Sequence, residues 1–117
     1  MAATPAKSME ALVEQLREYR SRLQAGGGAE RLAKQKEQGK LTARERVAAL
    51  VDADSFDEFG LFARHRQTQF GLADKEIPAD GVVTGAATIG GRLVHLASQD
   101  FTVLGGSAGE VHSLKVA

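Results

Sequence analysis

The chain has 117 residues, of which 43% are hydrophobic and 26% charged, and its formal net charge at pH 7 is zero. This length suits one domain with a single core. The absence of cysteine excludes disulfides and thiolate metal sites, and no apolar run approaches the ~20 residues of a membrane span. The start of the chain lacks the apolar region of a secretory signal, so we expect a cytoplasmic protein.

The charge is unevenly spread along the chain. Residues 1–50 carry ten Lys and Arg against six Asp and Glu, a balance of +4, whereas residues 51–117 carry five against nine, a balance of −4. A basic half can attract phosphates. Because acidic residues are interspersed within it, solvated helix faces are the favoured interpretation, and we expect no nucleic-acid partner.

Three helices are predicted in the first half. The first spans residues 7–24, with apolar residues at spacings of three and four that suit one partner helix: Met9, Leu12, Leu16, Tyr19 and Leu23. Three glycines at 26–28 end it. A surface helix over residues 29–38 follows, with Gly39 after its end.

The third helix is predicted to begin at Thr42. Thr42 and Glu45 fit the S/T-x-x-E capping box, and the apolar stripe consists of Val47, Leu50 and Val51. Residues 52–55 end this helix. An apolar segment then predicts a short strand or packed corner, with its residues as core anchors: Phe56, Phe59, Leu61 and Phe62. Residues 64–76 are polar and predict a loop.

A β-hairpin is predicted over residues 81–99. Gly90 and Gly91 separate two β-type runs, 81–89 and 92–99, and a two-residue turn of this kind needs positive φ angles. This turn pairs Ile89 with Arg92 and Ala87 with Val94. Both faces of the hairpin are apolar or small, so both need cover. His95, on an apolar strand, is expected to be a core histidine.

Residues 105–109 match G-x-S-x-G, the nucleophile elbow of α/β hydrolases. The match fails otherwise, because a triad needs an acid and a later histidine, and His112 is too close along the chain to serve Ser107. A backbone site is the better interpretation. Adjacent glycines before a helix let N–H groups approach a carbonyl or phosphate, although a plain strand-to-helix turn fits equally well.

The remaining polar residues give weaker signals. The three histidines, at 65, 95 and 112, do not form a metal signature. Several cations are candidates for binding phosphates, with ordinary surface charge as the favoured alternative: Lys40, Arg44, Arg46, Arg64 and Arg66.

Several segments, in this order, resemble the start of biotin-dependent acyl-CoA carboxyltransferase β subunits of the propionyl-CoA carboxylase type. They are Gly39–Arg46 (GKLTARER), Asp54–Phe59 (DSFDEF), His65-Arg66 with Phe70-Gly71, Ile77–Gly85 (IPADGVVTG) and Ser98–Glu110 (SQDFTVLGGSAGE). The resemblance covers residues 26–112. It implies an α/β fold, the opening part of a crotonase-like domain built of ββα units. We therefore divide the chain into a helical segment, 1–52, and the start of the carboxyltransferase domain, 53–117.

The resemblance also implies a reaction. Such subunits transfer a carboxyl group from carboxybiotin to the α-carbon of a short acyl-CoA. The carboxybiotin comes from a biotin carboxyl carrier or biotin carboxylase α subunit, and the full-length subunits form homo-oligomers. The family's main oxyanion-hole glycines match no residue here, so we expect no catalytic residue in this chain. The long spacing of the histidines separately leads us to expect no metal. We expect the loop of Gly105, Gly106 and Ser107 to bind the acyl-CoA.

Two hypotheses of different classes follow. The chain is either the front part of an acyl-CoA carboxyltransferase subunit or a non-catalytic helical and hairpin module that binds a partner through the seam of its first helix. Within the family, the sequence does not choose among carboxylation, transcarboxylation and decarboxylation, nor among acyl groups.

Overall fold

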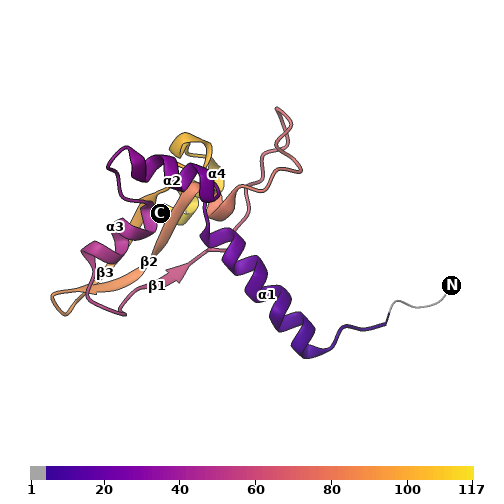
Figure 1. The fold of residues 1–117 in the computed structure, drawn as a ribbon, viewed down its shortest axis with the longest axis horizontal. Coiled ribbons are helices and arrows are strands. Elements are labelled where there is room, and N and C mark those ends of the chain that lie inside the picture. The colour runs from indigo at the N-terminus through magenta and orange to yellow at the C-terminus, as the bar shows by residue number, and fades with distance from the viewer. Residues whose placement is uncertain (1–4) are drawn as a thin grey trace.

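The computed structural model describes residues 5–117, and Figure 1 shows its helices and its small sheet. The helices are α1 (Met9–Gln24), α2 (Ala29–Glu37), α3 (Ala43–Leu50) and α4 (Glu110–Val116), and the strands are β1 (Asp57–Phe59), β2 (Val82–Ile89) and β3 (Arg92–Gln99). The strands form one antiparallel sheet in the order β1-β2-β3. No helix within the described residues is long and apolar enough to cross a membrane.

Capping residues set the starts of two helices. The Ser8 hydroxyl accepts a bond from the Ala11 amide at 3.2 Å, so α1 begins at Met9, two residues later than predicted. The capping box at α3 is confirmed: the Glu45 amide donates to Thr42 Oγ1 at 3.1 Å, and the Thr42 amide donates to Glu45 Oε1 at 3.3 Å. α2 has no buried residue, as expected for a surface helix.

The predicted hairpin is confirmed in its turn and its register. Ala87 pairs with Val94 and Ile89 with Arg92, and Gly90 and Gly91 have φ angles of 58° and 79°. The sequence analysis missed the role of Asp52. Its carboxylate accepts bonds from the amides of Gly90 and Gly91, both at 2.9 Å, and from the Thr88 hydroxyl at 2.8 Å. The end of α3 is therefore tied to the hairpin turn.

We expect replacement of Asp52 to weaken the fold in a pH-dependent way. The Gly91 amide, the Thr88 hydroxyl and the Gly90 amide all donate to the ionised carboxylate and hold the pKa of Asp52 below its usual value. The stabilisation is fully present above the unfolded pKa of about 3.9 and is lost as the pH falls through the lower folded pKa.

Urea unfolding of the wild type and Asp52→Asn at pH 7 and pH 3 tests this. The wild type should be more stable at pH 7, and the difference between the two proteins should shrink at pH 3. A difference that stays constant with pH would show that ionisation of Asp52 contributes nothing.

The sheet is covered on both faces only at its centre. On one face, Ala43 and Val47 of α3 pack against Val83, with partly buried Phe56 and Leu96 beside them. On the other face, β2 lies under α4. β3 is an edge strand. The outer part of the sheet therefore stays open, and Leu93 is 72% exposed.

Several expected core residues are consequently not buried. His95 is exposed because it lies on the uncovered side of β3, so the prediction of a core histidine is wrong. Phe59, at the end of the three-residue strand β1, is 47% exposed, and Phe62 is 43% exposed although its ring stacks on that of Tyr19. Of that segment, Leu61 is the buried anchor, and in α3 Leu50 is exposed.

A left-handed turn precedes β2 and is held by α4. Ala79 and Asp80 have φ angles of 52° and 48°, conformations that cost non-glycine residues roughly 1–2 kcal/mol each. Lys115 Nζ donates to the carbonyls of Ala79 (2.6 Å) and Val82 (2.7 Å). His112 is 2% exposed, its Nδ1 lies 2.8 Å from the Asp80 carbonyl, and its amide donates to Asp80 Oδ2 at 2.7 Å. Burial lowers the pKa of Lys115.

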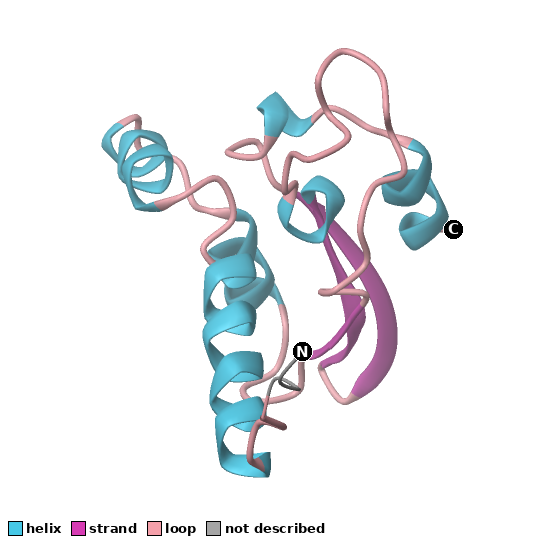
Figure 2. Cartoon of the chain, turned by 90° about the vertical axis from the view of Figure 1, so that its right-hand side faces the viewer, coloured by secondary structure: helices cyan, strands magenta, loops and turns pink. Residues whose placement is uncertain are grey.

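Residues 64–76 form no helix or strand, as predicted. This segment extends away from the body of the molecule in both ribbon views (Figures 1 and 2). Its base is closed by His65, whose Nε2 lies 2.7 Å from the Lys75 carbonyl oxygen.

Candidate functional site

The glycine turn between α1 and α2 lies directly on the segment that follows β3. The Gly27 amide donates to Thr102 Oγ1 at 3.0 Å, and the Thr102 amide donates to Asp100 Oδ1 at 3.0 Å. A Cβ on Gly27 would lie 2.6 Å from the Thr102 carbonyl carbon. Glycine is therefore required for this close approach, and not only for ending the helix as the sequence indicated.

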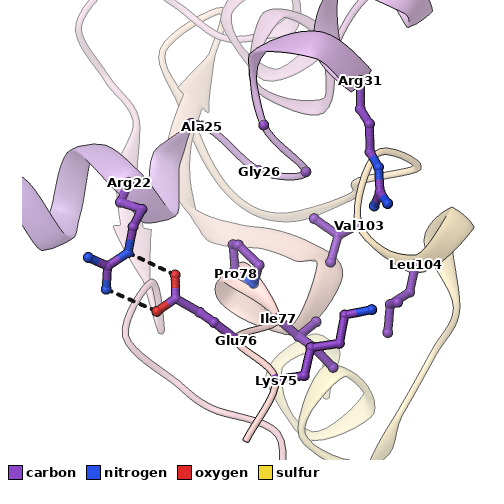
Figure 3. Close-up of a pocket in the computed structure, with 12 residues that line it drawn as sticks. Arg22, Ala25, Gly26, Arg31, Lys75, Glu76, Ile77, Pro78, Val103 and Leu104 are labelled. Atoms are coloured by element: carbon purple, nitrogen blue, oxygen red, sulfur yellow. Dashed lines mark hydrogen bonds and ion pairs between the residues drawn. The ribbon is translucent and has the colours of Figure 1, made fainter. Parts of the chain in front are cut away.

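A cavity of about 310 Å³ opens beside this turn (Figure 3). Its wall combines the glycine turn with residues from three other segments: Arg22, Ala25, Gly26, Gly27, Gly28, Arg31, Lys75, Glu76, Ile77, Pro78, Val103 and Leu104. Figure 3 shows the Arg31 guanidinium and the Lys75 side-chain nitrogen reaching toward the side of the cavity formed by Val103 and Leu104.

The cations of the wall are not equivalent. Arg22 binds Glu76 through two bonds of 3.0 Å each, and this bond holds the pKa of Glu76 below its usual value. That pair is neutral as a unit. Arg31 donates only to the Thr102 carbonyl, at 3.4 Å, among the bonds of the described residues. The charges of Arg31 and Lys75 therefore give the cavity a positive character.

A second cavity of about 460 Å³ adjoins the first, because Arg31 and Leu104 line both. Its other lining residues are Lys34, Gln35, Gln38, Phe101, Thr102 and Gly105. Phe101 is 66% exposed, and the Lys40 ammonium lies 5.9 Å from the centre of its ring. Cations beside an exposed aromatic ring suit a ligand that carries both a phosphate and a planar base.

Of the three residues predicted to form the acyl-CoA loop, one lines the second cavity. Gly105 lines the second cavity. The Gly106 amide donates to the Val103 carbonyl at 3.0 Å and the Ser107 amide to the Leu104 carbonyl at 3.2 Å, so both close turns within the loop. The His112 ring contacts Asp80 and Gln99 rather than Ser107, which agrees with rejecting a hydrolase triad.

The cations that the sequence analysis named as candidates for binding phosphates do not lie together at one site. Arg44 makes a bidentate bond to Glu58 at 2.6 and 3.0 Å, and Arg66 pairs with Glu110 at 3.2 Å. Arg46 lines a separate groove on the other side of α3. Of that set, Lys40 lies beside the cavities. Arg31 and Lys75 were missed, since nothing in their local sequence separates them from other surface cations.

Acidic and histidine side chains were also compared for metal-ligand spacing within the described residues. Residues 5–117 contain no group of three or more His, Asp or Glu side chains placed to hold a metal ion. The two cavities are lined by the cations Arg31, Lys34 and Lys75 and by the Phe101 ring.

Comparison with known proteins gives consistent matches. Residues 34–117 match the carboxyl transferase domain. The chain is 60% identical over 111 residues to the methylmalonyl-CoA carboxyltransferase 12S subunit of Propionibacterium freudenreichii subsp. shermanii, covering 95% of this chain and 21% of that protein. It is 52% identical over 108 residues to the propionyl-CoA carboxylase beta chain of Roseobacter denitrificans, covering 92% and 21%.

Among solved structures, the transcarboxylase 12S hexamer with methylmalonyl-coenzyme A and methylmalonic acid bound superposes with a TM-score of 0.91 at 60% identity. The match covers 96% of this chain and 22% of that one. The chain thus spans about a fifth of the length of these relatives.

Proposed function

The chain belongs to the carboxyl transferase domain family, and from that membership we propose that it supplies the N-terminal part of an acyl-CoA carboxyltransferase subunit. The whole subunit would move a carboxyl group from carboxybiotin to the α-carbon of a short acyl-CoA. The observation that carries this proposal is the 60% identity to the 12S subunit over 95% of the chain, together with a TM-score of 0.91. A non-catalytic module of unrelated ancestry would not give both.

The fold class expected from the sequence is confirmed as α/β and part of a crotonase-like carboxyltransferase domain. The division at residue 52 stays a prediction. Ala43 and Val47 lie before that boundary and pack against Val83 behind it, so we propose that the two parts fold together.

The substrate and partners are proposals that rest on the relatives. Their names refer to methylmalonyl-CoA and propionyl-CoA, which supports a short acyl-CoA as substrate. We propose that a biotin carboxyl carrier or biotin carboxylase α subunit supplies the carboxybiotin. We further propose that the full-length subunit is a homo-oligomer in the cytoplasm, as the 12S relative forms a hexamer.

The contribution of this chain is then to hold the nucleotide end of coenzyme A. Arg31 and Lys75 would bind phosphate oxygens, for which cationic donors suit, and Phe101 offers a ring against which a base can stack. The loop of Gly105, Gly106 and Ser107 borders the same region, and we retain it as the acyl-CoA loop, with Gly105 as the member that reaches the cavity.

Substitution of the cavity cations tests this role. We expect Arg31→Ala and Lys75→Ala each to weaken the binding of coenzyme A about tenfold, because a hydrogen bond to a charged group contributes about 1.5 kcal/mol and 1.4 kcal/mol is a factor of ten. Calorimetric titration of each protein with coenzyme A measures the dissociation constant. Arg46→Ala is the matched control, since Arg46 lines a different groove. Equal affinities for all four proteins would refute the assignment.

The 117-residue chain alone is expected to show no carboxyl transfer. The family's reaction needs two oxyanion sites, and removal of one donor of that kind typically costs about 10²–10³ in rate. A transfer assay with free carboxybiotin and several short acyl-CoAs, run against a no-protein blank, checks this. Turnover above the blank would place catalytic groups within this chain.

A further inference from the structure

One arginine in the wall of the first cavity already holds an oxyanion. The Nε and Nη2 atoms of Arg22 donate to the two carboxylate oxygens of Glu76, both at 3.0 Å (Figure 3). Both residues line the cavity. A guanidinium binds a carboxylate and a phosphate through the same pair of parallel N–H donors. Glu76 therefore occupies the side of Arg22 that suits a ligand phosphate.

The Arg22–Glu76 pair is exposed enough to exchange. The two side chains are 60% and 41% exposed, and ion pairs between solvent-exposed side chains contribute little to stability. The bidentate pair of Arg44 and Glu58 differs, since its side chains are 29% and 11% exposed and it joins α3 to β1. Opening the Arg22–Glu76 pair thus costs the fold little.

Arg22 has a second contact that does not depend on Glu76. Its guanidinium carbon lies 4.9 Å from the centre of the Tyr19 ring, and that ring stacks on Phe62 with centroids 5.5 Å apart. The face of an aromatic ring attracts a cation at this distance. Tyr19 therefore keeps the guanidinium beside the cavity when Glu76 leaves it.

The other cations of this cavity are free to act with Arg22. The wall holds three cations and one carboxylate, a balance of +2: Arg22, Arg31, Lys75 and Glu76. Within residues 5–117, neither Arg31 nor Lys75 forms an ion pair. Glu76 thus withholds one of three cations from an incoming anion.

We propose that Glu76 competes with the ligand phosphate for Arg22, and that Arg22 is a third phosphate-binding cation beside Arg31 and Lys75. This inference rests on the proposed function for the identity of the ligand. Glu76 carries one negative charge, whereas a phosphate monoester carries about −1.5 to −2 at pH 7. A phosphate that also reaches Arg31 and Lys75 displaces Glu76, and an anion that does not reach them leaves the pair closed.

Removal of the competing carboxylate tests the proposal. Glu76→Gln should tighten the binding of coenzyme A and of inorganic pyrophosphate about tenfold, because the freed guanidinium adds a hydrogen bond between charged groups. Arg22→Ala should weaken both about tenfold, and adding Arg22→Ala to Glu76→Gln should remove the gain. Calorimetric titration of each protein with each ligand measures the dissociation constants, and thermal melting followed by circular dichroism confirms that each variant is folded.

Glu14→Gln is the matched control. It removes the same charge and releases Arg17 from an exposed ion pair on α1, and neither residue lines either cavity. A gain in Glu14→Gln as large as that in Glu76→Gln would show a long-range effect of net charge and would overturn the proposal.

The sign of the Glu76→Gln effect separates competition from a structural role. A pair that only held the wall together would make Glu76→Gln and Arg22→Ala weaken binding alike. Coenzyme A that binds the wild type and Glu76→Gln equally would overturn this inference and leave the proposed function standing. Pyrophosphate that binds tighter to Glu76→Gln, with coenzyme A binding to no variant, would support the competition and refute the proposed function. Binding of neither ligand to any variant would refute both.

Discussion

Replacement of Gly27 by alanine is expected to cost about 3 kcal/mol of folding free energy or more. The added Cβ would overlap the backbone of Thr102, 2.6 Å from its carbonyl carbon. Backbone atoms cannot rotate away as the end of a side chain can, so the glycine turn must lift off residues 100–102. Overpacking of this kind costs typically 1–3 kcal/mol, and more where nothing yields. For a chain of this size the melting temperature should fall by roughly 10 °C.

Gly109→Ala is the matched control for this substitution. Gly109 has a φ of −103°, which alanine adopts freely, and its nearest neighbour to an added Cβ lies at an ordinary 3.7 Å. Thermal melting followed by circular dichroism compares the two variants. A Gly27→Ala melt that coincides with those of the control and the wild type would show that the turn does not rest on Thr102.

Replacement of Gly85 by alanine is expected to detach β1 from the sheet. Gly85 pairs with Glu58 in the central strand, and an added Cβ would lie 2.7 Å from Phe56 Cε2 and 3.0 Å from the Asp57 carbonyl carbon. The Phe56 ring can turn, but the strand backbone cannot. We expect a loss of about 2–4 kcal/mol.

Hydrogen exchange separates this outcome from general destabilisation. The amide protons that join β1 to β2 should lose their protection, while those between β2 and β3 keep more of theirs, because β1 and β3 lie on opposite sides of β2 and the overlap is with the β1 side. The same Gly109→Ala control applies. Equal loss of protection across all three strands would mean that β1 does not separate on its own.

Local rules account for the parts of the fold that the sequence predicted. The Gly90-Gly91 turn and the Thr42–Glu45 capping box each depend on neighbouring residues, and both are found in the structure. Tertiary contacts account for the rest. The sequence analysis did not anticipate that Asp52 would hold the hairpin turn, or that Gly27 would touch Thr102, since the partners lie 38 or more residues apart.

Burial was predicted least well, because it depends on where the sheet ends. His95 and His112 each follow a valine in the sequence, yet His95 lies exposed on an edge strand, whereas His112 lies in α4 and is buried against the left-handed turn before β2. The candidate site shows the same limit. The glycine motif identified Gly105 as a candidate site residue. Arg31 and Lys75 line the same cavity although they are 44 residues apart in the sequence. No local sequence pattern could have predicted that they lie near each other.

The most direct test of the account is to titrate the isotopically labelled 117-residue chain with coenzyme A and follow the backbone amide resonances. We expect concentration-dependent shifts at residues lining the two cavities, above all Arg31, Phe101 and Gly105, with the hairpin turn at Gly90 unaffected. No shift at millimolar coenzyme A, or shifts confined to surfaces away from these cavities, would contradict the claim that this chain holds the nucleotide end of the substrate.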